Sequence, residues 1–325
     1  MEGQAVPREM IFAEAINAAI VEEMQRDPDV IFYGQNMGMT EHDPMVKMFG
    51  RNRVRLTPIS ETAELGIAVG AALTGLRPIV ELWMAEFMLV AFDQVVNEAP
   101  RFRYMSGGRV KVPLVFKAGF GFAAGWAGQH SNCPYNMMLG VPGLRVVVPS
   151  TPADAKGLMT TSIRDDNPVV YLNHFMLTLD KGMIPDGDYS IPFGVADVRR
   201  AGSDITVVAT AWMVNKAIAA ADRLAAEGIS VEVVDPRTLA PLDTDTILKS
   251  VEKTRRLVLV DQAPRHGSVA ALIAAEVAEN GFHSLKAPIK LVTTLDASIP
   301  YSEPLERYAL PDEDKIAMAV RSVLQ

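Results

Sequence analysis

The chain has 325 residues, 49% of them hydrophobic and 22% charged, and its formal net charge is −8 at pH 7. This length suits two domains of ordinary size, each with a substantial core. An acidic balance without a cluster of Lys and Arg argues against nucleic acid as a partner. The single cysteine, Cys133, excludes a disulfide framework and a multi-cysteine metal site, and it fits a reducing, cytoplasmic compartment. No apolar run approaches the roughly 18 residues of a membrane span, and we expect no secretory leader.

Short β-branched runs alternate with longer segments of helical period, which predicts parallel sheets covered by helices. In the first half the predicted strands are 30–33, 79–82, 112–116, 144–148 and 169–172, and the predicted helices are 9–24, 63–76, 87–103 and 153–164. Several of these strands are apolar on both faces, as buried parallel strands are.

From residue 174 to about 200 the pattern dissolves into Pro, Gly and Asp, which predicts an ordered linker. A second alternating set follows, with strands at 205–209, 230–235, 257–260 and 289–292 and helices at 214–226, 244–251, 268–280 and 313–324. The expected fold class is therefore α/β, with two doubly wound domains at residues 1–190 and 200–325.

The segment Thr57-Pro-Ile-Ser-Glu61 precedes a helix crowded with Gly and Ala. Pro58 disfavours helical geometry at Thr57, and Ser60 or Thr62 is expected to cap the helix. Each glycine in a helix interior costs up to about 1 kcal/mol, so we expect another backbone to approach closely. Glu61 lies near the helix N-terminus, which favours its anionic form. On spacing alone it is either an exposed first-turn glutamate or a group that serves chemistry.

A glycine-rich segment, residues 117–131, follows a predicted buried strand, where an open parallel sheet places its ligand loops. Four glycines in ten residues suggest a phosphate cradle, but the spacing matches neither a Walker loop nor a dinucleotide fingerprint. His130 ends this segment. A lone loop histidine is more often a surface or core residue than a catalytic one, and both interpretations stay open.

The segment Ser162-Ile-Arg-Asp-Asp-Asn-Pro168 is a polar turn between a predicted helix and a predicted strand. Pro168 is expected to set the start of the strand. Carboxylate, amide and backbone oxygens are also the ligands that hard cations prefer, so a cation site is the alternative.

Apart from spacing, short segments of the sequence resemble those of a known family. They occur in the same order as in the family and cover nearly the whole chain. The matching segments are 57–61, 66–72, 75–78, 91–98, 104–108, 129–131, 142–147, 154–157, 163–168, 235–239, 241–243 and 299–301. They are similar to the β subunits of thiamine-diphosphate-dependent 2-oxo-acid dehydrogenase components, which act on pyruvate, branched-chain 2-oxo acids or acetoin. The resemblance implies a pyrimidine-binding domain followed by a transketolase C-terminal-type domain.

The resemblance also implies roles for particular residues. Glu61 matches the glutamate that hydrogen-bonds the aminopyrimidine nitrogen of thiamine diphosphate, where a charge-assisted bond favours the protonated ring. Phe87 matches an aromatic ring against the aminopyrimidine. His130 matches a loop histidine beside the reacting carbon, able to donate a proton or orient a substrate carboxylate. A structural potassium site found in some members corresponds to Leu114, Ser162, Ile163, Asp165 and Asn167.

The Gly-Asp-Gly and Asn motif that holds Mg²⁺ and the diphosphate in this enzyme class is absent from the sequence. In the family this motif lies on an α subunit, so the resemblance implies a shared cofactor and an α₂β₂ heterotetramer. It also implies decarboxylation of a 2-oxo acid and acyl transfer to lipoamide on a lipoyl-bearing acyltransferase. The alternatives are a carboligase that delivers a two-carbon unit to a carbon acceptor, and a non-catalytic β-like scaffold.

Several positions depart from the usual family residues. Gln35 and Asn36 stand where a Glu-Asp pair is common, and Asn173 and Gln262 replace common glutamates. Gly140 occupies the place of a second histidine, which lies near the active-site mouth in the family. These departures keep the cofactor-binding motifs and alter the approach to them, so we expect a changed substrate or acceptor.

Overall fold

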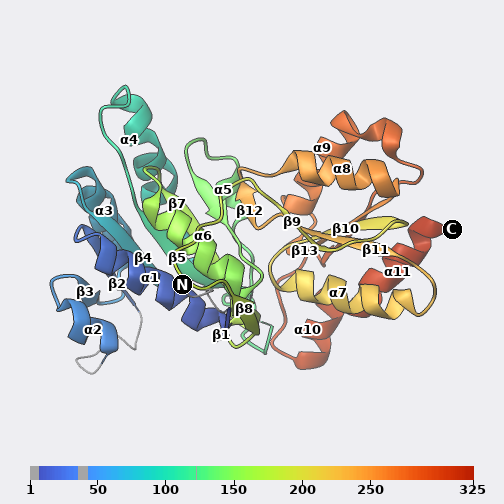
Figure 1. The fold of residues 1–325 in the computed structure, drawn as a ribbon, viewed down its shortest axis with the longest axis horizontal. Coiled ribbons are helices and arrows are strands. Elements are labelled where there is room, and N and C mark those ends of the chain that lie inside the picture. Colours follow the sequence, from blue (N-terminus) through green and yellow to red (C-terminus); the bar gives the residue numbers. More distant parts are fainter. Residues whose placement is uncertain (1–6, 36–42, 122) are drawn as a thin grey trace, which may run out of the picture. The chain divides into compact units, whose positions relative to one another are not determined.

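The computed structural model describes residues 7–35, 43–121 and 123–325. The chain forms two compact units (Figure 1). The first holds the chain to Phe120 together with Met138–Phe193, and the second holds Gly121–Met137 and Gly194–Gln325. The expected α/β class is confirmed. The predicted boundaries at 190 and 200 stay a prediction, and the glycine-rich loop from 121 to 137 groups with the second unit.

The first unit is built on six parallel strands in the order β6-β7-β5-β4-β2-β3. They are β2 (Val30–Gly34), β3 (Val54–Leu56), β4 (Arg77–Met84), β5 (Val115–Phe120), β6 (Arg145–Val147) and β7 (Val169–His174). Every residue of β5 is buried, as expected for a central strand covered on both faces. Strands β1 (Arg8–Ile11) and β8 (Lys181–Ile184) form a separate antiparallel pair.

The helices of the first unit are α1 (Phe12–Arg26), α2 (Pro44–Phe49), α3 (Glu61–Leu73), α4 (Ala99–Met105), α5 (Asn136–Leu139) and α6 (Pro152–Arg164), of which α5 begins at the junction with the second unit. Helices α1 and α6 pack together. Their contact includes a buried carboxylate, Glu23, which accepts bonds of 2.6–3.0 Å from the guanidinium groups of Arg26 and Arg164. These bonds raise the pKa of Arg164 and satisfy a charge that would be costly to bury alone.

Three predictions for this unit need correction. The predicted helix 87–103 is instead a 3₁₀ helix η1 (Ala85–Ala91), a π-helix η2 (Gln94–Glu98) and the short α4, in whose first turn Pro100 lies. Pro100 has no N–H to donate to the preceding turn, which fits the change from π- to α-helical bonding there. The predicted strand 112–116 begins later, at Val115, after Pro113. Helix α1 begins at Phe12 rather than residue 9, because Arg8–Ile11 pairs with β8.

The second unit contains a five-stranded sheet in the order β14-β13-β10-β11-β9, in which only β9 runs antiparallel. Its strands are β9 (Asp197–Arg200), β10 (Ile205–Ala209), β11 (Val231–Asp235), β13 (Leu257–Pro264) and β14 (Lys290–Thr294), with a short β12 (Thr238–Ala240) outside this sheet. The helices are α7 (Trp212–Ala225), α8 (Thr244–Thr254), α9 (Val269–Asn280), α10 (Glu303–Ala309) and α11 (Glu313–Leu324). Short 3₁₀ turns are η3 (Phe175–Leu177), in the first unit, and η4 (Phe282–Ser284). The predicted linker therefore contains two strands, β8 and β9.

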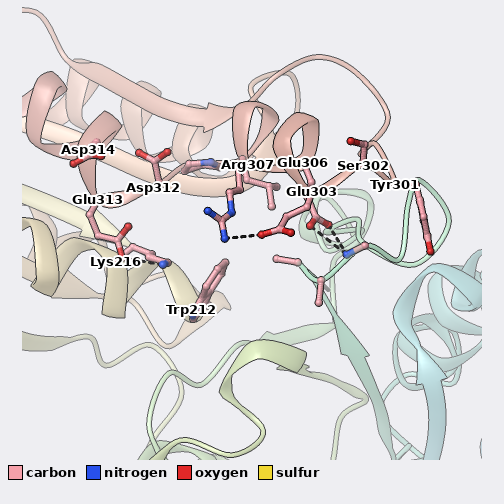
Figure 2. Close-up of a pocket in the computed structure, with 15 residues that line it drawn as sticks. Trp212, Lys216, Tyr301, Ser302, Glu303, Glu306, Arg307, Asp312, Glu313 and Asp314 are labelled. Atoms are coloured by element: carbon pink, nitrogen blue, oxygen red, sulfur yellow. Dashed lines mark hydrogen bonds and ion pairs between the residues drawn. The ribbon is translucent and has the colours of Figure 1, made fainter.

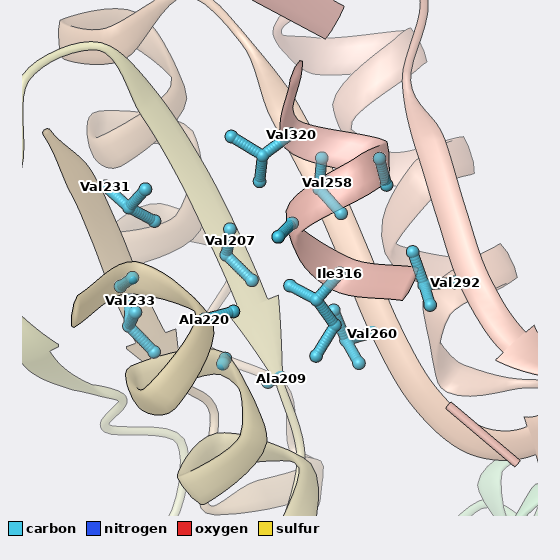
Figure 3. Close-up of a cluster of buried hydrophobic side chains, with 14 of the residues drawn as sticks. Val207, Ala209, Ala220, Val231, Val233, Val258, Val260, Val292, Ile316 and Val320 are labelled. Carbon is cyan, nitrogen blue, oxygen red and sulfur yellow. The ribbon is translucent and has the colours of Figure 1, made fainter. Parts of the chain in front are cut away.

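Figure 3 shows how strand periodicity builds the core of the second unit. Val207 and Ala209, Val231 and Val233, and Val258 and Val260 are alternate residues on three adjacent strands, so they share one face of the sheet. That face packs against Ala220 of α7 and Ile316 and Val320 of α11. Burial of each valine or isoleucine in this set contributes about 1.5–3 kcal/mol, and burial of each alanine contributes less.

Candidate active site

The carboxyl ends of parallel strands share one edge of the first sheet, which is where open α/β sheets bind ligands. Gln35 follows β2, the residues of η1 follow β4, and Asn173 lies near the end of β7. Helix α3, with Glu61 at its first position, follows β3 at the same edge. Sequence segments far apart in the chain are thus gathered where a cofactor ring can bind.

Glu61 is half-buried, and its two carboxylate oxygens differ in their hydrogen bonding. Oε1 accepts a bond of 3.2 Å from Nε2 of Gln35. Within the described residues, Oε2 accepts no hydrogen bond. A carboxylate held by one oxygen and open at the other fits the hydrogen bond to an aminopyrimidine nitrogen that the sequence predicts.

The start of α3 differs in detail from the expectation. The helix begins at Glu61, and Ser60 is the N-cap residue, but neither Ser60 nor Thr62 caps it with a side chain. Thr62 donates from Oγ1 to the carbonyl of Val90 at 3.1 Å, and this bond ties the helix to η1. The backbone N–H of Ser60 instead donates to Glu64 at 3.4 Å.

The glycines of α3 do not receive the close contact predicted for them. A Cβ at Gly70 would meet nothing within 4 Å, and one at Gly66 would meet only the Gln94 side chain at 3.9 Å. Ile67 between them is 59% exposed. In the part of the chain that is described, no second backbone comes within 4 Å of the Cβ position at either glycine.

Phe87 lies in η1 and is half-buried. Its segment contacts α3, so Phe87 and Glu61 come from neighbouring elements of one unit. This arrangement fits the predicted aromatic contact with the aminopyrimidine.

His130 belongs to the second unit, in the loop that follows β5. It is half-buried, and its ring makes an edge contact with the Trp126 ring, with centroids 5.9 Å apart. The loop is held at two points. Gln262 donates from Nε2 to the Gly121 carbonyl at 3.1 Å, and the N–H of Gly125 donates to Glu306 at 3.2 Å.

Figure 2 shows the pocket of the second unit in which this second contact lies. Its cavity volume is about 990 Å³. Glu306 on α10 is only 3% exposed and points at the Gly125 amide, while Lys216 pairs with Glu313 at 2.8 Å. A buried carboxylate already accepts from the Gly125 amide, so this amide is not free for a phosphate, and the phosphate cradle suggested for residues 117–131 otherwise stays a prediction. The acidic lining, which includes Glu303, Asp312 and Asp314, disfavours any anionic ligand there.

Four of the five residues predicted to bind potassium have their oxygen hydrogen-bonded by a nitrogen donor in the structure. Ile163 O accepts from Arg77 Nε at 3.1 Å, and Leu114 O accepts from Val169 N at 2.9 Å. Asn167 accepts from an Arg103 guanidinium N–H at 2.7 Å and donates its own amide to Asp165 at 2.7 Å. Ser162 uses its hydroxyl to donate to Leu158 O. A carbonyl oxygen has two lone pairs, so the potassium site stays a prediction.

The departures from the family pattern fall in distinct environments. Gly140 is exposed, and a Cβ there would meet nothing within 4 Å, so the space a histidine would fill is open. The side-chain oxygen of Asn173 is buried and accepts no hydrogen bond from the described residues. Gln262 is buried and holds the loop, as above. Asn36 lies outside the described residues.

No group of three or more His, Cys, Asp or Glu that could hold a metal ion occurs among the described residues. Within the same residues, no helix is both long and apolar enough to cross a membrane.

The fold and the edge site define a class, the thiamine-diphosphate enzymes related to transketolase. Residues 8–177 match the transketolase pyrimidine-binding domain, and residues 194–316 match the transketolase C-terminal domain. A solved structure, "Split gene transketolase, inactive beta4 tetramer", has the same fold, with a TM-score of 0.78 over 99% of each chain at 22% identity.

Within that class, the chain belongs to the family of β subunits of 2-oxo-acid dehydrogenases, as the sequence motifs predicted. It is 43% identical to the β subunit of acetoin:2,6-dichlorophenolindophenol oxidoreductase from Cupriavidus necator, over 98% of each chain. It is 41% identical to subunit β-2 of the mitochondrial pyruvate dehydrogenase E1 component of Oryza sativa subsp. japonica, over 98% of this chain and 87% of that one. The 2-oxoisovalerate dehydrogenase subunit β of Bacillus subtilis is 38% identical, over 97% and 99%. The chain is thus a subunit of a heteromeric thiamine-diphosphate enzyme with an α-subunit partner.

Sequence reasoning missed how two residues act at the site. Glu64 and Gln35 form the polar support behind Glu61, and their contact joins residues 29 positions apart. A signal for Glu64 was present, since an acidic residue close behind an N-cap Ser can bond back to the cap N–H.

Proposed function

We propose that this chain supplies the carboxylate that activates thiamine diphosphate in an α₂β₂ complex, which decarboxylates a 2-oxo acid and passes the acyl unit to lipoamide on a partner acyltransferase. Mg²⁺ and the diphosphate are held by the α subunit. The observation that carries this proposal is the Glu61 carboxylate, held through Oε1 and open at Oε2 at the carboxyl edge of the parallel sheet. The cytoplasmic location and the potassium ion stay predictions.

The bound thiamine supplies a nucleophilic carbon for attack on the 2-oxo carbon, and the residues of this chain prepare and shield it. Glu61 holds the proton of the ring nitrogen through a short charge-assisted bond. Phe87 is placed to pack on the aminopyrimidine ring, a contact worth about 0.5–1.5 kcal/mol beyond burial. His130 is the candidate proton donor near the substrate.

A second candidate is a carboligase that delivers the two-carbon unit to a carbon acceptor. Two observations favour a changed substrate or acceptor, the open space at Gly140 and the unpaired buried oxygen of Asn173. An unpaired buried acceptor costs about 1–3 kcal/mol, which a donor on a ligand would recover. A site built to pair a polar substrate group discriminates strongly against analogues without it.

Turnover of the αβ complex on a panel of 2-oxo acids tests the proposal, first with an artificial electron acceptor and then with a lipoylated domain. The proposed function predicts turnover of a 2-oxo acid with the lipoylated domain as acceptor. The departures at Gly140 and Asn173 predict that a 2-oxo acid other than pyruvate is preferred by at least about tenfold in kcat/KM, or ~1.4 kcal/mol. An equal preference for an acceptor other than lipoamide would instead favour the carboligase. If pyruvate and the lipoyl domain are the best pair, the departures at Gly140 and Asn173 are structural drift. If no 2-oxo acid is turned over, the non-catalytic scaffold is the better account.

A further inference from the structure

Three side chains form a hydrogen-bonded row at the start of α3. The amide nitrogen Nε2 of Gln35 lies 2.9 Å from Oε2 of Glu64 and 3.2 Å from Oε1 of Glu61. Gln35 is 8% exposed and Glu64 is 2% exposed, whereas Glu61 is half-buried toward the edge of the sheet. One amide thus joins a buried carboxylate to the carboxylate that serves the cofactor.

The backbone before Gln35 is fixed by a contact that only glycine allows. Gly34 has φ +146°, and a Cβ there would lie 2.1 Å from the carbonyl oxygen of Glu81. The N–H of Gln35 donates to that same oxygen at 2.9 Å. The close approach of β2 to β4 therefore sets where the Gln35 side chain starts.

Glu64 is fixed from the other side. Its Oε1 accepts from the Thr57 hydroxyl at 2.7 Å and from the Ser60 N–H at 3.4 Å, and its carbonyl accepts from the Tyr33 hydroxyl at 2.9 Å. Burial, with a smaller effect of the Glu64 charge, raises the pKa of Tyr33, so this phenol stays a donor. An ionised carboxylate can only accept hydrogen bonds. Gln35 must therefore turn its NH₂ group, not its carbonyl, toward both glutamates.

The neighbouring charges do not replace this donor. On β4 and β5, Glu81 and Lys117 pair with each other. Among the described residues, no Lys or Arg hydrogen-bonds Glu61 or Glu64. The Gln35 amide is thus the group that separates and satisfies the two carboxylates.

We propose that Gln35 is a positioning residue for Glu61, which anchors Oε1 through a neutral donor and leaves Oε2 directed at the aminopyrimidine nitrogen. The inference rests on the proposed function of Glu61. A neutral donor between two carboxylates orients both without adding charge. A third carboxylate in the same place would lie within hydrogen-bond distance of the other two, and one of the three would have to hold a proton.

The test uses the assembled αβ complex with the variants Gln35→Met and Gln35→Glu. Gln25→Met is the matched control, because Gln25 is exposed on α1 of the same unit. The rate of proton–deuterium exchange at C2 of bound thiamine diphosphate and the affinity for the cofactor are measured separately. Gln35→Met should slow exchange about tenfold or more and weaken affinity less than about threefold, because positioning acts on the proton step more than on binding. The control should leave both unchanged.

A second readout needs no cofactor. Infrared spectra of the cofactor-free complex should show a new protonated carboxyl in Gln35→Glu at neutral pH that is absent from the wild type. A protonated carboxyl at position 35 is a donor like the amide, so C2 exchange in Gln35→Glu should approach the wild-type rate at low pH. It should fall further below that rate as rising pH removes the shared proton.

Wild-type exchange in Gln35→Met would overturn the inference. If Gln35→Met does not assemble, the Gln35→Glu variant decides, and a pH profile and infrared spectrum like the wild type would overturn it equally. The variant Glu61→Gln distinguishes failure of the role of Gln35 from failure of the proposed function of Glu61. Slow exchange in Glu61→Gln with wild-type exchange in Gln35→Met removes only the role of Gln35, whereas wild-type exchange in Glu61→Gln removes the proposed function as well.

Discussion

Glu61 accepts a hydrogen bond from Gln35 on one carboxylate oxygen and none from the described residues on the other, and this asymmetry is what the proposed chemistry requires. An amide at this position would keep the size of the side chain and could still bond a ring nitrogen. It could not stabilise the proton on that nitrogen, because it carries no charge.

Replacement of Glu61 by Gln should therefore slow C2 proton–deuterium exchange of the bound cofactor by about 10²–10⁴-fold, the usual contribution of a positioned acid–base group. Assembly with the α subunit should survive, because the two side chains are nearly isosteric. Exchange followed by NMR on the assembled complex measures the effect, and the assembly state is the control. Exchange at the wild-type rate in an intact complex would remove Glu61 from the mechanism.

At this scale, the residue type and its motif were enough to nominate Glu61, Phe87 and His130 by resemblance, and their roles stay predictions. The supports were not found, because Gln35 meets Glu64 only after β2, β3 and α3 are in place. Local sequence also gave no sign that Glu306 binds the Gly125 amide, since 181 positions separate them.

At the scale of elements, hydrophobic period was the reliable signal. Strand β10 and helix α11 have the predicted bounds, because β10 is an unbroken, fully buried run rich in β-branched residues and α11 carries an uninterrupted 3.6-residue period. Strands β1 and β8 were missed, because each is four residues long and is stabilised by pairing with the other across the chain. In the predicted helix 87–103, Pro100 was the local signal for the boundary between η2 and α4, and the apolar pattern gave no sign of the 3₁₀ helix η1.

Helix α8 offers a test of how a cap responds to pH. Asp243 accepts from the N–H of Ala196 at 2.8 Å and from the N–H and hydroxyl of Thr246 at 3.0 and 2.7 Å. Burial pushes the pKa of this carboxyl up, but the hydrogen bonds outweigh it and hold the pKa below its usual value. A carboxyl whose pKa is lower in the folded state stabilises the fold above the unfolded pKa of about 3.9, and loses that contribution as pH falls through the lowered value.

Asp243→Asn should thus destabilise the chain by about 1 kcal/mol at neutral pH, because the amide offers one acceptor oxygen in place of two. The difference from the wild type should shrink at an acid pH below the unfolded pKa of about 3.9, because the wild-type carboxyl takes up a proton as pH approaches its lowered folded-state pKa. Urea unfolding of the purified chain at the two pH values measures the difference in free energy of unfolding between the variant and the wild type at each pH. Asp245→Asn, exposed in the first turn of the same helix, is the control and should change stability by a few tenths of a kcal/mol. If the variant and the wild type differ in free energy of unfolding by the same amount at both pH values, the charge of Asp243 has no role.

At the scale of the whole molecule, motif order along nearly the full chain predicted the two-domain α/β fold and the family, and both are confirmed. The assignment of the 121–137 loop could not be predicted, because it depends on contacts with residues such as Gln262 and Glu306 far along the chain. Substrate and acceptor do not follow from the fold, because related chains with this fold carry names that refer to acetoin, pyruvate and 2-oxoisovalerate.

The central claim is that this chain supplies the catalytic carboxylate while its α partner supplies the diphosphate and Mg²⁺ site. Because the Gly-Asp-Gly and Asn motif is absent from this sequence, most of the binding energy of thiamine diphosphate should come from the partner.

Calorimetric titration of thiamine diphosphate with Mg²⁺ into the purified chain, and then into the αβ complex, tests this claim most directly. We expect the chain alone to bind with a Kd no better than about 1 mM, or about −4 kcal/mol, and the complex to bind far more tightly. Micromolar binding by the chain without an α subunit would contradict the account, because the diphosphate site would then lie on this chain.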